Sequence, residues 1–194
     1  IEAALLWRLL PRIPKSRRTG ERYLLEIVRL LSQRNGTTIQ TFVVEDPQEI
    51  QGINSRLELA RAQATLRRWI QEEHMARGVT IVDPASTHID DGVVIGQDTV
   101  IKPHTVIEPD VRIGRGCVVG PFARLRSGTV LEDASQVGNF VEVVRSRIGR
   151  GVKALHLTYL GNATVGEKAN IGAGTITCNY DGFLKYPTRI ARRS

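Results

Sequence analysis

The stretch IDDGVVIGQDTVIKPHTVIEPDVRIGRGCVV, residues 89–119, carries an aliphatic residue at every sixth position. The series continues to residue 177 with two steps shortened to five, and most of its aliphatic residues are followed four positions later by a small residue. Its positions are Ile89, Ile95, Ile101, Ile107, Ile113, Val119, Leu125, Leu131, Val137, Val143, Ile148, Ala154, Leu160, Val165, Ile171 and Thr177. A six-residue repeat with one large and one small inward residue predicts a parallel β-helix whose coils have three short faces. We therefore expect no helix between residues 95 and 175.

The same period predicts which residues stack from coil to coil. On the first face these are Leu125, Val143, Leu160 and Thr177; on the second, Leu131, Ile148 and Val165; on the third, Val137, Ala154 and Ile171. Because neighbouring residues in a strand point to opposite sides, this register also predicts which side chains face outward.

Four polar residues are expected along one outward strip of the first face. Arg126, Glu142 and Tyr159 each follow or precede an inward residue, and His156 lies at the corner that leads into that face. An outward histidine near a carboxylate can act as a general base near neutral pH, and arginine and tyrosine can hold a phosphorylated ligand. The alternative is that His156 is a solvated or hydrogen-bonded corner residue, and spacing alone leaves the two interpretations open.

The residues before the repeat have a different pattern. The pattern of residues 1–53 predicts a mixed α/β segment. It contains an amphipathic helix over 23–31 that stops near Asn35-Gly36, and a strand over 38–44. Residues 54–80 are expected to be a linking helix, capped by Asn54 or Ser55 and ended by Gly78. Residues 81–194 would then be the β-helix domain, with regular coils over 89–182.

Composition narrows the class of protein. The net charge is +7, but no nucleic-acid motif or aromatic platform accompanies it, so we expect no nucleic-acid partner. The short apolar runs predict no membrane span. The chain has only two cysteines, which are too few for a disulfide framework. This low number is compatible with the reducing environment of the cytoplasm. Cys117 occupies a small inward slot and is expected in the core, and Cys178 is expected to be packing rather than a nucleophile.

Several motifs resemble one bacterial enzyme family. They are GPFARLRSG (120–128), QVGNFVEV (136–143) and KALHLTYLGNATVGEKANIGAGTITCNYDG (153–182), followed by Lys185. These are similar to the bifunctional N-acetylglucosamine-1-phosphate uridyltransferase / glucosamine-1-phosphate acetyltransferase. GINSRLELA (52–60) and GVTIVDPAS (78–86) resemble its interdomain segment, and TGERYLLEI (19–27) more weakly resembles the tail of its Rossmann-like nucleotidyltransferase domain. Residues 1–53 would be the remnant of that domain.

The resemblance implies a left-handed β-helix that moves acetyl from acetyl-CoA to the amine of glucosamine 1-phosphate, for UDP-N-acetylglucosamine synthesis. It implies His156 as catalytic base supported by Glu142, and a homotrimer with sites between subunits. The residues implied to bind the sugar phosphate are Arg126, Tyr159, Asn170 and Lys185, and those implied to meet acetyl-CoA are Ala173, Asn179 and Tyr180. No metal is expected in this site, because Mg²⁺ belongs to the uridyltransferase site.

The chain also departs from the family. Val144 stands where the family has a substrate-binding lysine, and the register places it on the outward strip one coil above Arg126, with Arg145 on the opposite side of the strand. Leu155 replaces a family glycine, and Arg17 replaces a metal-binding asparagine. The Gly-rich nucleotide loop is missing, and the family continues for further coils beyond the tail IARRS, so we expect a fragment without uridylyl transfer. A non-catalytic trimeric β-helix module is the alternative. A β-helical carbonic anhydrase fails, because it needs three histidine ligands for zinc and only His156 is suitably placed.

Overall fold

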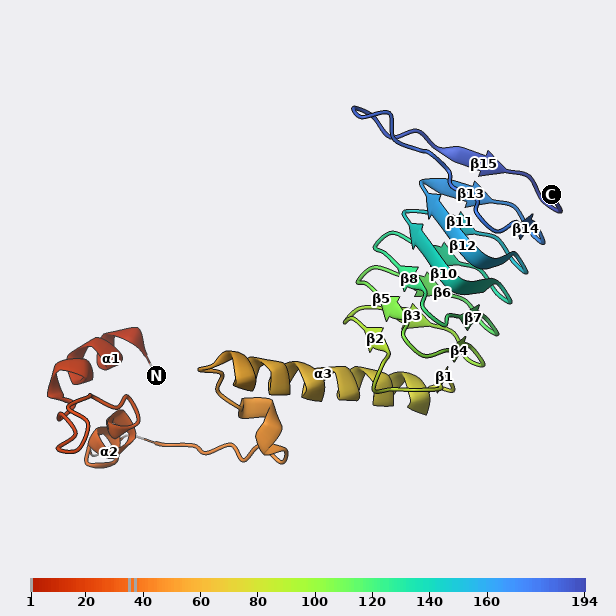
Figure 1. The fold of residues 1–194 in the computed structure, drawn as a ribbon. Coiled ribbons are helices and arrows are strands. Elements are labelled where there is room, and N and C mark those ends of the chain that lie inside the picture. The colour runs from red at the N-terminus through yellow and green to blue at the C-terminus, as the bar shows by residue number, and fades with distance from the viewer. Residues whose placement is uncertain (1, 35, 37) are drawn as a thin grey trace. The chain divides into compact units, whose positions relative to one another are not determined.

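The computed structural model describes residues 2–34, 36 and 38–194, which fall into two compact units, residues 1–50 and 51–194 (Figure 1). The first unit contains the helices α1 (Ala3–Leu9), η1 (Leu10–Arg12), α2 (Glu26–Ser32) and η2 (Pro47–Ile50). The second contains one helix, α3 (Arg56–Ala76), and all the strands of the described residues.

The first unit has a small apolar core made by Leu9, Ile13, Ile27 and Leu31. The predicted helix over 23–31 is confirmed as α2, although it begins later, and Asn35, where it was expected to stop, lies outside the described residues. The strand predicted over 38–44 is wrong. Those residues form no strand, and Phe42 and Val43 are 90% and 81% exposed. Alternating β-branched residues make a strand only where a partner strand and an apolar layer receive them, and the described residues of this unit form no strand and leave this segment exposed.

Helix α3 begins and ends as its sequence predicts. The Ser55 hydroxyl accepts a hydrogen bond from the Glu58 backbone N–H at 3.2 Å, and Gly78 takes the left-handed conformation (φ +89°) just past the end. The helix covers the first coil of the β-helix. Gln71 is buried there, and its amide donates to the carbonyls of Pro84 and Thr87 at 3.0 and 2.8 Å.

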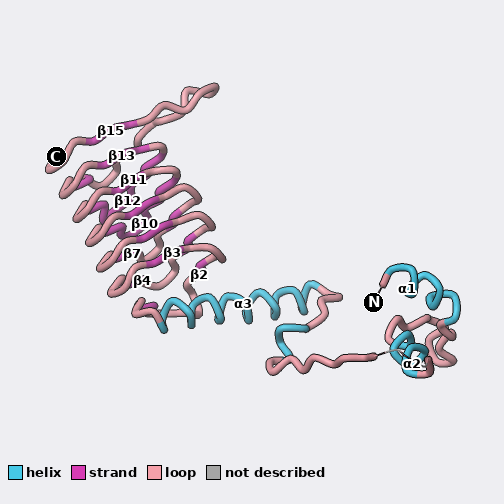
Figure 2. Tube along the Cα trace, turned by 180° about the vertical axis from the view of Figure 1, so that it is seen from behind, coloured by secondary structure: helices cyan, strands magenta, loops and turns pink. Residues whose placement is uncertain are grey.

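The second unit is a left-handed parallel β-helix, as predicted, and no helix lies between residues 95 and 175 (Figure 2). Its strands are β1 (Thr80–Ile81), β2 (His88–Ile89), β3 (Val94–Ile95), β4 (Val100–Ile101), β5 (Val106–Ile107), β6 (Arg112–Ile113), β7 (Val118–Val119), β8 (Arg124–Leu125), β9 (Val130–Leu131), β10 (Gln136–Val144), β11 (Arg147–Ile148), β12 (Lys153–Gly161), β13 (Ala163–Val165), β14 (Asn170–Ile171) and β15 (Thr188–Ile190). Pairing begins at β1 and ends at β15, so the coils reach beyond the expected 89–182 at both ends.

The predicted register is confirmed on all three faces. Leu125 pairs with Val143 and Val143 with Leu160 on the first face, which holds β2, β5, β8 and the second halves of β10 and β12. Leu131, Ile148 and Val165 are paired on the second face, and Val137, Ala154 and Ile171 on the third. Every one of these aliphatic side chains is buried, and Cys117 is fully buried among them as predicted.

Residues with a left-handed backbone turn the corners between the faces. The corner between the third and first faces has His104, Phe122, Phe140 and Leu157 in successive coils, with φ from +45° to +57°. The rings of His104, Phe122 and Phe140 stack with centroids 4.7 and 5.1 Å apart, and we call these four residues the corner ladder. The corner between the first and second faces has Arg145 (φ +44°) and Asn162 (φ +51°). Such φ values cost energy for residues other than glycine, so the stacked coils must hold them in place.

Candidate active site

Arg126, Glu142 and Tyr159 lie together on the first face, as the register predicts. Glu142 is the partner of Arg124 on one side and of Tyr159 on the other. The Arg126 Nη1 atom donates to Glu142 Oε1 at 3.0 Å, and Arg126 Nε lies 3.8 Å from Glu108 Oε1. The hydrogen bond that Arg126 donates to Glu142 raises the pKa of Arg126, so this guanidinium stays charged at every working pH. Its Nε is buried without a hydrogen-bond partner, which leaves one donor unused.

His156 lies on the other side of the corner ladder, which corrects the expectation of a single outward strip. The side chain is exposed and lines a hollow with Gln136, Asn139 and Leu155, whereas Glu142 and Tyr159 line a second hollow with the ladder residues. The physical reason is the turn at Leu157: His156 precedes it at the end of the third face, and Tyr159 follows it on the first. Within one chain the two hollows are neighbours that open on either side of the ladder.

Asn139 is the polar neighbour of His156 that sequence reasoning missed. The two residues are register partners in β10 and β12, and the buried Asn139 Oδ1 atom has no hydrogen-bond partner. A buried acceptor without a donor is costly, so it indicates a place where a donor from a ligand or a neighbour belongs. The signal was present in the sequence, because Asn139 lies one coil below His156 in the register.

The backbone under this hollow is tightly packed. A Cβ atom added to Gly138 would lie 2.2 Å from the Leu155 carbonyl oxygen, so only glycine lets these coils approach so closely. Leu155, which replaces a family glycine, points its half-buried side chain into the same hollow as His156.

The remaining predicted residues come from the last coil. Asn170 and Ala173 are exposed around the third face, and the hairpin after Cys178 carries Tyr180 and Lys185, which pair as an antiparallel bridge. Asn179 is buried, and its amide donates to Asn162 Oδ1 at 2.7 Å. Cys178 is exposed, so the expectation that it packs is wrong; the left-handed backbone at this residue (φ +43°) turns it out of the β-helix.

Val144 and Arg145 differ from expectation. Val144 was expected on the outward strip, but β10 extends to this residue and pairs it with Gly161, and its side chain is only 2% exposed. The left-handed turn at Arg145 then sends that side chain outward, into a hollow that Lys185 also lines.

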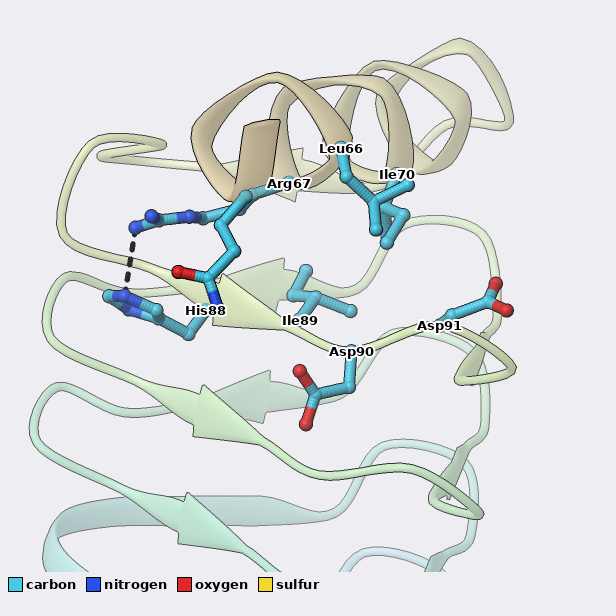
Figure 3. Close-up of a pocket in the computed structure, with 8 residues that line it drawn as sticks. Leu66, Arg67, Ile70, His88, Ile89, Asp90 and Asp91 are labelled. Atoms are coloured by element: carbon cyan, nitrogen blue, oxygen red, sulfur yellow. Dashed lines mark hydrogen bonds between the residues drawn. The ribbon is translucent and has the colours of Figure 1, made fainter. Parts of the chain in front are cut away.

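A further hollow lies where α3 meets the first coil (Figure 3). Arg67 reaches from α3 to β2, and its Nη1 donates to His88 Nε2 at 2.8 Å, while Asp90 and Asp91 lie at the other end. None of the predicted site residues lines this hollow. Among the described residues, no group of three or more His, Cys, Asp or Glu could hold a metal ion, and no helix is long and apolar enough to cross a membrane.

Part of the repeat matches a known family model. Residues 92–127 match the family described as bacterial transferase hexapeptide (six repeats). Among solved structures, a mutant of GDP-perosamine N-acetyl transferase from Caulobacter crescentus shares 17% identity over 68% of this chain and 60% of its own, with a TM-score of 0.39, a likeness too partial to bear on activity.

The curated relatives of the chain are GlmU proteins. The chain is 41% identical to the bifunctional protein GlmU of Heliobacterium modesticaldum over 97% of its own length and 48% of that protein. It is 40% identical to the GlmU of Pelobacter propionicus over 98% of its own length and 48% of that protein. The chain is therefore a relative of the GlmU proteins, which confirms the resemblance carried by the motifs. It spans about half the length of the curated relatives it matches.

Proposed function

We propose that this β-helix carries the acetyl-transfer centre of a glucosamine-1-phosphate N-acetyltransferase. The observation that carries the proposal is the exposed His156, next to an unpaired buried acceptor on Asn139, in a hexapeptide β-helix related to GlmU. Residues 1–53 would be the end of a nucleotidyltransferase domain and residues 54–80 the helix that links it to the β-helix. Free thiols and the absence of a membrane-spanning helix in the described residues favour a cytoplasmic setting.

His156 would act as the general base. The amine of the sugar is protonated near neutral pH, and it can attack only after it gives up a proton to the imidazole. The nitrogen then forms a bond to the acetyl carbon while the carbon–sulfur bond breaks. His156 can return its proton to the thiolate sulfur, and the second proton that the nitrogen must lose to become an amide leaves to solvent. Asn139 Oδ1 would accept a hydrogen bond from the imidazole N–H or from the amine, and so orient the reacting pair.

Acetyl-CoA supplies an acetyl group activated as a thioester. The residues implied to hold it fit in part: Ala173 and Tyr180 are exposed, whereas Asn179 is buried and bonded to Asn162. Tyr180 and Ala173 would therefore make the direct contacts, and Asn179 would hold the Asn162 corner beneath them.

The assembly would be a homotrimer with its sites between subunits. Within one chain, the ladder separates His156 from Glu142, and Phe122, Phe140 and Leu157 are 46%, 55% and 61% exposed. A second subunit that covers this apolar edge would close both hollows and let residues from two chains meet the same substrate.

The test is an assay of acetyl transfer from acetyl-CoA to glucosamine 1-phosphate by the intact protein, in which the released coenzyme A thiol is measured. We expect His156→Ala to lower kcat at least 100-fold while the assembly seen by sedimentation is unchanged, because general-base groups contribute about 10²–10⁴-fold. His88→Ala is the matched control, since that histidine lies at the base of the β-helix and bonds to Arg67. Activity within a few-fold of the parent in His156→Ala would exclude the base role. Trimers that bind no acetyl-CoA would favour the non-catalytic module.

A further inference from the structure

The edge of the third face beside His156 is a column of glycines that one leucine interrupts. Each residue that directly follows an inward residue of this face lies in the column. From the coil of β7 to the coil of β14 these residues are Gly120, Gly138, Leu155 and Gly172. Leu155 therefore supplies the one side chain in this part of the column. It is half-buried, and it lines the hollow that His156 and Asn139 also line.

The backbone fixes the direction in which Leu155 points. Its neighbours in β12, Ala154 and His156, are register partners of Val137 and Asn139 in β10. A Cβ added to Gly138 would lie 2.2 Å from the Leu155 carbonyl oxygen, so the two backbones are in close contact. The leucine is thus held on a rigid strand, and its side chain projects into the hollow before any ligand arrives.

This hollow suits an uncharged group. Besides His156, Lys102 is the one ionisable residue among the described residues that line it, and it lies three coils below Leu155. The hollow on the other side of the corner ladder instead holds Arg124 and Glu142. The phosphorylated sugar of the proposed reaction therefore belongs on the charged side, and the acyl end of the thioester belongs beside His156 and Leu155.

The chemistry of transfer brings the acyl chain close to this leucine. His156 must lie within hydrogen-bond reach of the amine nitrogen that it deprotonates. That nitrogen bonds to the carbonyl carbon of the thioester, and the methyl carbon of an acetyl group is one bond further. Each additional carbon of a longer acyl chain must be placed in the space around the imidazole, and Leu155 occupies part of that space.

We propose that Leu155 is a specificity-determining residue that limits the transferred acyl group to acetyl. The inference rests on the proposed function, because it assigns a wall to the acyl group of that reaction. A propionyl thioester would have to displace a side chain whose backbone is fixed by its neighbouring coil. An apolar pocket separates substrates that differ by one methylene by about 10- to 200-fold, so one leucine is sufficient for this selectivity.

The experiment compares acetyl-CoA with propionyl-CoA in two assays of the intact protein. The first measures kcat/KM for transfer to glucosamine 1-phosphate, and the second measures the Kd of each thioester by calorimetry without the sugar. Leu155→Ala and Leu155→Val shorten the side chain, whereas Leu155→Met keeps its volume. Val94→Ala is the matched control, because Val94 is an outward aliphatic residue of β3 that is 55% exposed and lines neither hollow.

We expect Leu155→Ala to raise the propionyl-to-acetyl ratio of kcat/KM by at least about 10-fold, and Leu155→Val to raise it less. The relative affinity for propionyl-CoA should rise in the same order, and Leu155→Met and Val94→Ala should keep the ratios of the parent. A general loss of folded protein would lower transfer from both thioesters alike and would not move the ratio.

Parent ratios in both shortened variants would overturn the proposal. A protein that transfers neither acyl group, but whose relative affinity for propionyl-CoA rises when Leu155 is shortened, would overturn the proposed function and leave the acyl wall standing. A protein that binds neither thioester would overturn both.

Discussion

The flat faces of the β-helix bury repeated aliphatic residues, whereas its corners expose residues that vary from coil to coil. On the faces, Leu125 and Val143 stack with their neighbours in successive coils, fully buried, in strands that pair in the same register. At the corners, Leu157 and Arg145 take left-handed backbones and expose their side chains, and what stands there changes from coil to coil. Burial of the repeated aliphatic residues supplies the favourable free energy of folding that holds the strained corners, and the corners direct polar groups into the hollows.

The largest effect is expected for a face residue. Leu125→Ala removes a fully buried side chain between Ile107 and Val143, and we expect a loss of about 2–5 kcal/mol in the free energy of unfolding. Denaturant unfolding would measure it. Val106→Ala is the control, since Val106 points outward from the strand below and is 38% exposed. Equal losses in the two variants would mean that the faces do not dominate stability.

Filling the close backbone contact between Gly138 and Leu155, beside the corner ladder, should destabilise the fold less than Leu125→Ala and lower activity more. Gly138→Ala forces a methyl group against the Leu155 carbonyl, and we expect a loss of about 1–3 kcal/mol through displaced backbone. Because that carbonyl belongs to the residue before His156, acetyl transfer should fall by more than the loss of folded protein explains. Gly172→Ala is the control, with nothing within 4 Å of its added Cβ. If both alanine variants were as stable and active as the parent, the close approach under His156 would have no role.

The predictability of the molecule follows the same division. The six-residue period predicted the inward residues and the pairing of every tested coil, because a repeated register propagates from one coil to the next. It did not predict that His156 and Glu142 line separate hollows or that Val144 is buried and Arg145 turned outward. Those outcomes depend on one φ angle at Leu157 and one at Arg145, which the period does not encode. In residues 38–44, the alternation of β-branched residues predicted a strand, but no repeat supplies a neighbouring strand there, and these residues form no strand.

The site is predictable to the same extent. The resemblance supplied the residue roles, and these stay predictions, but it gave no warning of the buried acceptor on Asn139 or of the hollow shared by Arg145 and Lys185. Both features arise between coils, from residues 17 positions apart in the case of Asn139 and His156. Only the stacked register brings such residues side by side, so reading each motif by itself does not find them.

The smallest effect is expected away from both faces and corners, at the end of α3. His74 is 6% exposed, and burial lowers its pKa, with Arg77 acting in the same direction and Glu73 against it. A histidine with a lowered pKa in the folded state binds its proton more readily when unfolded, so stability falls as the pH drops below about 6.5 toward the folded value. We expect urea unfolding between pH 7 and pH 5 to depend less on pH in His74→Gln than in the parent. A pH dependence in His74→Gln equal to that of the parent would contradict the assignment. The effect is modest because it involves one proton on one residue, and the helix end can open toward water without loss of the stacked coils.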